Sequence, residues 1–309
     1  MNSCIHPGKE RHKQSGVALI LVLFLLAIVS LLAVNAGEKT YQLQLRLSMQ
    51  KQQQAILSEQ FALERFALEQ YSEHIQSSQT SSPRQEWQQP LTLPIEESQL
   101  NIQLMQQPAC FNLSSLAGLS INQLQSNTGL KQLLLLLENL NAPSPLTSLE
   151  DILKANEHLP NSVNDINPIQ SKQILKQRLN TQWSSNDWEA LAPFICYLPS
   201  PYSRWNINGF NAQHQPLLKA LLLNQLQDSD IEDLINLANT KGFDSNHSFW
   251  QFDSLKAMAF PAELKLQLRT KSEYYWLNMQ IHRSHSRLEQ WYFLQQQGSN
   301  LKKRYSYRT

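Results

Sequence analysis

The longest run of apolar residues lies near the N-terminus, from Val17 to Val34, and only Ser30 interrupts it. In a helix such a run rises about 27 Å, enough to cross the apolar part of a bilayer. Helices in soluble cores are rarely apolar on every face, so the run predicts a membrane-spanning helix. A secretory signal cleaved near Ala36 is the alternative interpretation.

The pattern behind this run predicts that the helix continues. From Glu38 to Ser82 there is neither Pro nor Gly, and apolar residues recur on one helical face. We expect one helix from about Val17 to Ile75. Its transmembrane half covers 17–36 and its amphipathic stem covers 37–78.

The next segment changes from helix to sheet. Gln79–Pro94 is rich in Ser, Gln and Pro and predicts a loop. Gln99–Met105 then alternates between apolar and polar residues, as a half-buried strand does. We expect this strand to pack on the stem and to bury Phe61 and Leu68.

Helical patterns follow from about Gly118, and alternation returns near the end. The helical signals are Gly129–Leu140, a capping box at Thr147–Glu150, a start at Pro168, Gln213–Gln227, a capping box at Ser229–Glu232 and an end at Gly242. Two alternating segments, Tyr275–Ile281 and Leu288–Leu294, flank a polar turn. The expected class is α+β: a long N-terminal helix packed on an antiparallel sheet, with a large all-helical domain inserted between strands.

The net charge of the chain and its sequence motifs argue against several classes of function. The chain has 309 residues, of which 26 are Lys or Arg and 25 are Asp or Glu, so its net charge of +1 does not favour a nucleic-acid partner. Signatures of nucleotide binding and zinc hydrolysis are absent, and so is the G-x-S-x-G pattern of a nucleophilic serine. His282 and His285 lie in a predicted turn, where we expect solvation and no metal. The sequence thus predicts no enzyme, metal site or nucleic-acid binding.

Three cysteines bear on the compartment. Cys4 precedes the apolar run, whereas Cys110 and Cys196 lie far beyond it. If that part of the chain is exported, Cys110 and Cys196 form a candidate disulfide, since exported proteins meet an oxidising environment. Two separate buried thiols are the alternative.

The N-terminal arrangement resembles that of type IV pilin-like precursors. It has a short basic leader that ends in Gly, an apolar helix directly after it and an amphipathic continuation into a C-terminal head. In that family a membrane peptidase cuts after the Gly and methylates the new amine. The resemblance implies a leader over 1–16 and a processing site between Gly16 and Val17.

Three further segments resemble the general secretion pathway protein K family, the minor pseudopilins K of type II secretion. They are ACFNLSSL (Ala109–Leu116), FICYLPSPYSRWNINGFNAQHQPLLKALL (Phe194–Leu222) and EYYWLNMQIHRSHSRLEQWYFLQQQ (Glu273–Gln297). The resemblance implies the first part of a pilin-like sheet over 79–108, an inserted helical domain over 109–262 and C-terminal strands over 263–309.

The same resemblance implies a function. Such a subunit lies at the tip of a periplasmic pseudopilus and helps to start its assembly, for export of folded proteins across the outer membrane. Its partners are minor pseudopilins I and J, other pseudopilins and the prepilin peptidase. It crosses the bacterial inner membrane once, with a cytoplasmic N-terminus, as Lys9, Arg11 and Lys13 also favour, and a periplasmic head. A minor type IV pilin and a single-pass anchored periplasmic binding or enzymatic domain are the alternatives.

Two departures from the family pattern matter. Most pilin-like subunits carry glutamate at the fifth mature residue, but here that position is Leu21. An unpaired carboxylate is costly in lipid, so its absence is expected of a subunit with no predecessor. Some family members bind calcium, but their acidic motif is not recognisable between Cys110 and Cys196. We therefore expect no cofactor.

Overall fold

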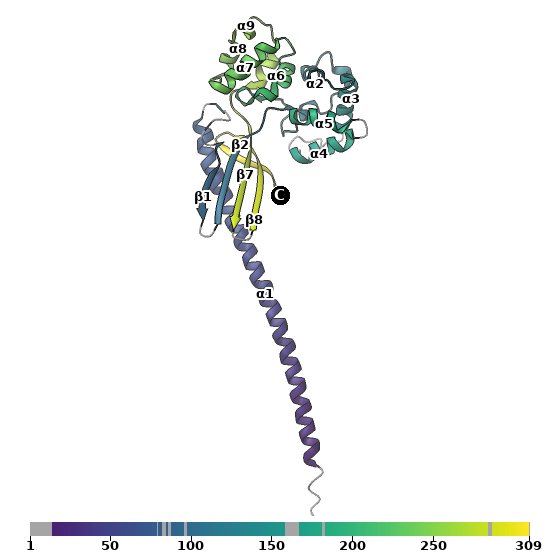
Figure 1. Cartoon of the computed structure of the whole chain (residues 1–309), viewed down its shortest axis with the longest axis vertical. Coiled ribbons are helices and arrows are strands. Elements are labelled where there is room, and N and C mark those ends of the chain that lie inside the picture. Colours follow the sequence, from purple (N-terminus) through teal and green to yellow (C-terminus); the bar gives the residue numbers. More distant parts are fainter. Residues whose placement is uncertain are drawn as a thin grey trace, which may run out of the picture. The chain divides into compact units, whose positions relative to one another are not determined.

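The computed structural model describes residues 14–78, 80–81, 85, 88–95, 98–157, 167–180, 183–283 and 286–308. The chain divides after Phe66 into two compact units. Helix α1 (Gln14–Ser77) supplies the described part of the first unit and, from Ala67 onward, the first element of the second (Figure 1). The predicted long helix is confirmed, because no proline interrupts its hydrogen bonds.

A five-stranded antiparallel sheet dominates the second unit, in the order β1-β2-β7-β8-β9 (Figure 1). Its strands are β1 (Leu91–Ile95), β2 (Ser98–Gln106), β7 (Tyr274–Arg283), β8 (Ser286–Gln297) and β9 (Asn300–Arg308). One face of β7 is buried along its length through Tyr275, Leu277, Met279 and Ile281. The predicted alternation of this strand is therefore confirmed.

The last turns of α1 pack within this unit. Ala67, Tyr71 and Ile75 recur every four residues and are at most 5% exposed. The Ser72 hydroxyl accepts a hydrogen bond from the backbone N–H of Leu301 in β9 (3.2 Å). The prediction for Phe61 is wrong, since its side chain is 64% exposed.

The expected loop up to Pro94 is also wrong in part, because β1 occupies Leu91–Ile95. Proline donates no hydrogen bond, but a strand at the edge of a sheet tolerates it. Strand β1 lies at such an edge and pairs with β2, where Pro94 stands opposite Gln99.

A series of helices lies between β2 and β7. They are α2 (Thr128–Asn139), α3 (Pro145–Asn156), α4 (Pro168–Leu179), α5 (Ser185–Leu191), α6 (Gln215–Leu221), α7 (Asp228–Thr240), α8 (Asn246–Trp250), α9 (Asp253–Lys256) and α10 (Ala262–Gln267). Their apolar side chains share one core, in which Leu133, Leu136 and Leu137 of α2 are fully buried. The insertion between the strands is therefore mainly helical, as the predicted α+β fold class requires.

Short strands also lie within the insertion. Strands β3 (Phe111–Asn112) and β4 (Ile195–Cys196) pair in parallel, as do β5 (Trp205–Asn206) and β6 (Leu268–Arg269). The boundary expected between 262 and 263 falls inside α10, and the sheet resumes only at Tyr274. These two-residue pairs are too short to leave an alternating pattern.

Several helix ends differ from the sequence patterns. Helix α3 begins at Pro145 rather than at the Thr147 capping box. Helix α6 ends at Leu221 because Leu223 and Asn224 adopt positive φ. The Asn224 and Asn139 side chains exchange two hydrogen bonds (3.0 and 3.1 Å). This tertiary contact holds the turn in place.

Candidate functional site

The first candidate site is the apolar half of α1. Gly16 and Val17 lie in its first turn, and Leu21 is 56% exposed on the next. The stretch from Leu19 includes an 18-residue window of mean hydropathy 2.9 with no residue buried. So much exposed apolar surface is unfavourable in water. By length and composition the helix fits a single-pass membrane anchor.

Cys110 and Cys196 are joined by a disulfide, with Cα atoms 5.7 Å apart and 86 residues of separation in sequence. Both are less than 10% exposed. The bond lies beside the β3–β4 pair and closes a loop that contains α2 to α5. It thus links the two ends of this part of the helical insertion.

A buried asparagine joins two of the sequence segments that carried the family resemblance. The Asn112 side-chain oxygen accepts hydrogen bonds from the backbone N–H groups of Ser114 (3.1 Å) and Leu198 (2.8 Å). Its amide donates to the Ser200 and Tyr202 carbonyls (2.9 and 3.3 Å). Asn112 is 1% exposed, so this residue organises two segments that are far apart in the sequence.

Asn208 performs a similar role in the second half of the insertion. Its side chain accepts from the Phe243 backbone N–H (2.7 Å) and donates to the Phe243 carbonyl (3.0 Å). The adjacent Gly242 ends α7 with φ +77° and donates to the Leu237 carbonyl (2.9 Å), as predicted for a helix-ending glycine.

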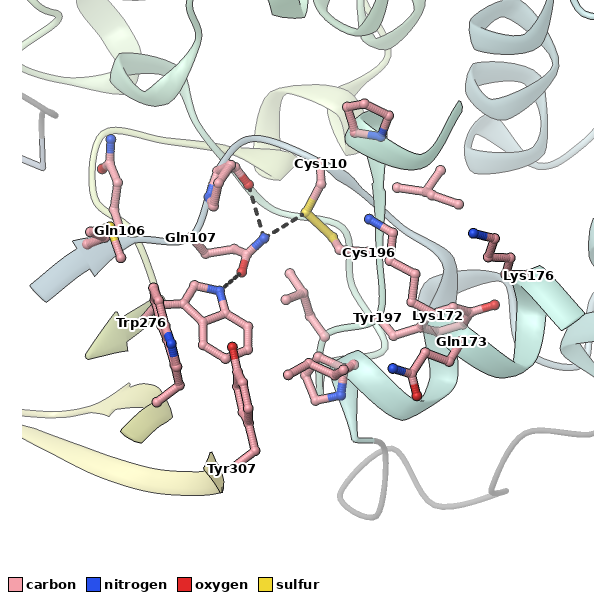
Figure 2. A pocket seen from close by; sticks show the side chains of 18 of the residues that line it. Gln106, Gln107, Cys110, Lys172, Gln173, Lys176, Cys196, Tyr197, Trp276 and Tyr307 are labelled. Atoms are coloured by element: carbon pink, nitrogen blue, oxygen red, sulfur yellow. Dashed lines mark hydrogen bonds between the residues drawn. A yellow bond between two sulfur atoms is a disulfide. The ribbon is translucent and has the colours of Figure 1, made fainter. Parts of the chain in front are cut away.

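The second candidate site is a pocket of about 540 Å³ between the sheet and α4. Trp276 and Tyr307 lie on one side and Lys172, Gln173 and Lys176 on the other, with the disulfide between them (Figure 2). Most of its lining is apolar or aromatic. Such a pocket with a few polar groups is typical of a binding site.

Hydrogen bonds fix the wall formed by Trp276. Its indole N–H donates to the Gln107 side-chain oxygen (2.6 Å), and the Gln107 amide nitrogen lies 3.4 Å from the Cys110 sulfur (Figure 2). The Gln107 backbone N–H also donates to the Tyr274 carbonyl (2.9 Å). The tryptophan is therefore held in one orientation, and the disulfide is tied to the sheet.

The two lysines on the α4 side differ. The Lys172 ammonium donates to the Ala192 carbonyl, and burial lowers the pKa of Lys172. Lys176 lies one turn further along α4 and is exposed. Asp and Glu are absent from the described residues that line this pocket. Its electrostatic character is therefore positive.

The histidines do not form a site in the part of the chain that the structure describes. His214 is 9% exposed, packs edge-on to Phe194 and Phe210, and accepts from the Asn211 N–H (3.2 Å). His282 lies in β7, whereas His285 is outside the described residues. Groups of three or more His, Cys, Asp or Glu residues are not found among the described side chains.

Sequence reasoning missed the pocket. The available signal was the pair Trp276 and Trp291, which stand on the strand face that is otherwise mostly polar, beside Asn278 and Gln280. A large aromatic residue on a face expected to be solvated is informative. No such signal marked the contribution of α4 to the pocket, because α4 ends at Leu179 and β7 begins only at Tyr274.

Comparisons with known proteins were made for the whole chain. A scan against protein-family models finds no match. The chain is 25% identical over 295 residues to an Escherichia coli K12 protein described as "Putative type II secretion system protein K", covering 86% of this chain and 89% of that one.

A solved structure shares the fold. One chain of the GspK-GspI-GspJ complex of the enterotoxigenic Escherichia coli type 2 secretion system matches with a TM-score of 0.61 and 20% identity. The match covers 85% of this chain and 99% of that one, and it supports the pilin-like α+β fold. In sequence the chain is thus similar to a protein described as type II secretion system protein K, and in fold it is similar to a chain of the GspK-GspI-GspJ complex.

Proposed function

We propose that the chain is a minor pseudopilin of a type II secretion system, anchored in the bacterial inner membrane by α1. The observation that carries the proposal is the order of elements along the chain. An exposed apolar helix comes first, and a pilin-like sheet follows, with a helical insertion between its strands β2 and β7. The likeness to protein K over most of both chains supports the secretion role over that of a type IV pilin.

Processing and orientation belong to this proposal. Lys9, Arg11 and Lys13 on the N-terminal side of the apolar run favour a cytoplasmic N-terminus. The prepilin peptidase then cuts between Gly16 and Val17 and methylates Val17. The head, residues 67–309, lies in the periplasm, where an oxidising environment is compatible with the Cys110–Cys196 bond.

Partners and position in the filament form the finer part of the proposal. The fold match is to a chain from a complex of GspK, GspI and GspJ, and we infer that this chain assembles with minor pseudopilins I and J. Leu21 supports a place at the tip. Without a carboxylate there, the subunit needs no earlier subunit to neutralise a charge in the membrane.

The role is structural: the subunit helps to start assembly of a filament that exports folded proteins. No reaction is assigned to it.

Mass spectrometry of the N-terminus tests this function. The full chain is expressed with and without the prepilin peptidase, and its mature N-terminus is sequenced. We expect an N-methylated Val17 only when the peptidase is present. An intact N-terminus in its presence would contradict the pseudopilin assignment.

Co-purification tests the partners. The processed chain is expressed with tagged pseudopilins I and J in detergent. A stable three-subunit complex is expected, and a chain that instead purifies with type IV pilin subunits would favour the pilin alternative.

A further inference from the structure

The pocket beside the disulfide extends into a longer groove. A second hollow of about 460 Å³ lies next to it, lined partly by Tyr305 and Ser306 of β9. The two hollows share lining residues from α4 and from the sheet: Pro168, Ile169, Gln173, Trp276 and Tyr307. Together they form a continuous groove between α4 and the last strands, called here the β9 groove.

The sheet side of the β9 groove is an ordered aromatic surface. Trp291 and Tyr307 stack with nearly parallel rings and centroids 6.3 Å apart. Trp276 meets Tyr307 edge to face at 6.2 Å. Tyr307 is 36% exposed. Rigid aromatic residues at a partly exposed surface are typical of the energetic centres of interfaces.

The charges around the groove select the chemistry of an occupant. Lys172 and Lys176 of α4 line the groove, and Lys176 is exposed. The nearest acid on the strands, Glu289, is engaged by Asn278, Trp291 and Arg287. A partner segment with acidic side chains therefore complements the positive charge of the groove.

The position of β9 adds a second argument. It is the last strand of the five-stranded sheet, and β8 is its partner in the described part of the chain. Its outer edge presents backbone groups that an extended peptide can pair with. A second copy adding its own β9 would bring two rows of lysines and arginines together, which is unfavourable.

We propose that the β9 groove binds an extended, acidic segment of a partner protein. An apolar side chain of that segment packs on Trp276 and Tyr307, a carboxylate lies near Lys176, and the backbone of the segment lies along β9. The proposal concerns a binding surface of the head and goes beyond the membrane anchoring, processing and assembly proposed above.

Site-specific photocrosslinking tests the proposal in cells that express the full chain and the whole secretion system. Tyr307 is replaced by the photoreactive benzoylphenylalanine, an aromatic residue that suits the groove. Tyr202, which is 63% exposed elsewhere on the head, receives the same probe as the control position. Adducts are digested, and the crosslinked peptide is sequenced by mass spectrometry.

We expect position 307 to crosslink to a peptide of another protein that contains an apolar residue next to Asp or Glu. Lys176→Glu reverses a positive charge that lines the groove, and Gln173→Trp fills the groove from an exposed position of α4. Each of these two substitutions is expected to lower the yield of the crosslink from position 307 about fivefold or more. Lys256→Glu, an equal charge reversal on α9, leaves the yield unchanged.

Three outcomes would overturn the proposal. They are crosslinks only to a second copy of the chain, crosslinks only to lipid or to nothing at position 307, and protein crosslinks that Lys176→Glu and Gln173→Trp leave unchanged. Unfolding midpoints of the variants show that the head stays folded. Cleavage after Gly16 is measured in the same cells, so failure of the groove is distinguishable from failure of the proposed function.

Discussion

The leucines of α1 and those of α2 are the same residue in the same secondary structure, yet their surroundings are opposite. Leu21, Leu25 and Leu26 are 51–57% exposed, whereas Leu133 and Leu136 are fully buried. Helix α2 has polar residues on its other face and is covered by its own chain, as α6 illustrates through the Gln132 bond to the Leu221 carbonyl (3.0 Å). The apolar half of α1 has no polar face. Its leucines require an environment supplied by something other than this chain.

The largest expected effect concerns the disulfide of the head. Closing a loop of 86 residues is worth about 4.6 kcal/mol in the free energy of unfolding. The double variant Cys110→Ser/Cys196→Ser should lose most of this stability in denaturant titrations under oxidising conditions. The extractability of the chain from membranes should stay as before, because α1 contains neither residue.

A reductant provides the matched control for that experiment. Dithiothreitol should destabilise the unaltered chain and leave the double variant unchanged. A change in mass after alkylation with and without reductant checks the bond directly, and equal alkylation in both samples would mean that the two thiols are free.

Paired leucine truncations test the comparison itself. Leu136→Ala should lower the free energy of unfolding of the head by about 2–5 kcal/mol, because it leaves a cavity in a fully buried site. Leu25→Ala should leave the unfolding of the head unchanged in detergent. Equal destabilisation by both would show that α1 contributes to the same core.

A charge in α1 sharpens the other half of the comparison. Leu25→Lys places an ammonium near the middle of the apolar run and should disfavour membrane insertion by about 3 kcal/mol. Alkaline extraction of membranes measures the fraction released. Lys256→Ala on α9, outside the apolar run, should release none.

The pH dependence of the head should follow His214. Burial lowers the pKa of His214 from its ordinary value of 6.5, so below that value the unfolded chain binds a proton that the folded head does not. Stability should therefore fall as the pH falls from 6.5 through the lowered pKa of the folded state. Denaturant titrations at several pH values measure this, and His214→Gln should show a shallower slope.

The smallest expected effect is at Leu21. Leu21→Glu should leave cleavage after Gly16 intact, because the substitution lies five residues beyond the proposed cut and adds the residue usual in pilin-like subunits. Mass spectrometry of the N-terminus provides the readout. Loss of cleavage would contradict our interpretation of that position.

The fold and the candidate site were predictable to different degrees. Local periodicity was enough for α1, for the alternation of β7 and for the helical character of the insertion. It was not enough for β9, whose Lys302, Lys303 and Arg304 suggest a solvated tail. Strand β9 forms because β8 offers it a partner, with Trp291 opposite Tyr307 and a register shift at Phe293/Leu294.

By itself, the sequence determined the apolar run, the Pro-free long helix and the segments that resemble a known family, because each depends on residues close together in the chain. Only the tertiary structure decided the short α6, the Asn112 contacts and the β9 groove. These depend on partners far apart in the sequence: 85 residues separate Asn139 from Asn224, and 86 separate Asn112 from Leu198. Local pattern carries no information on which distant side chains will meet, so a site built at such a meeting appears only once the chain has folded.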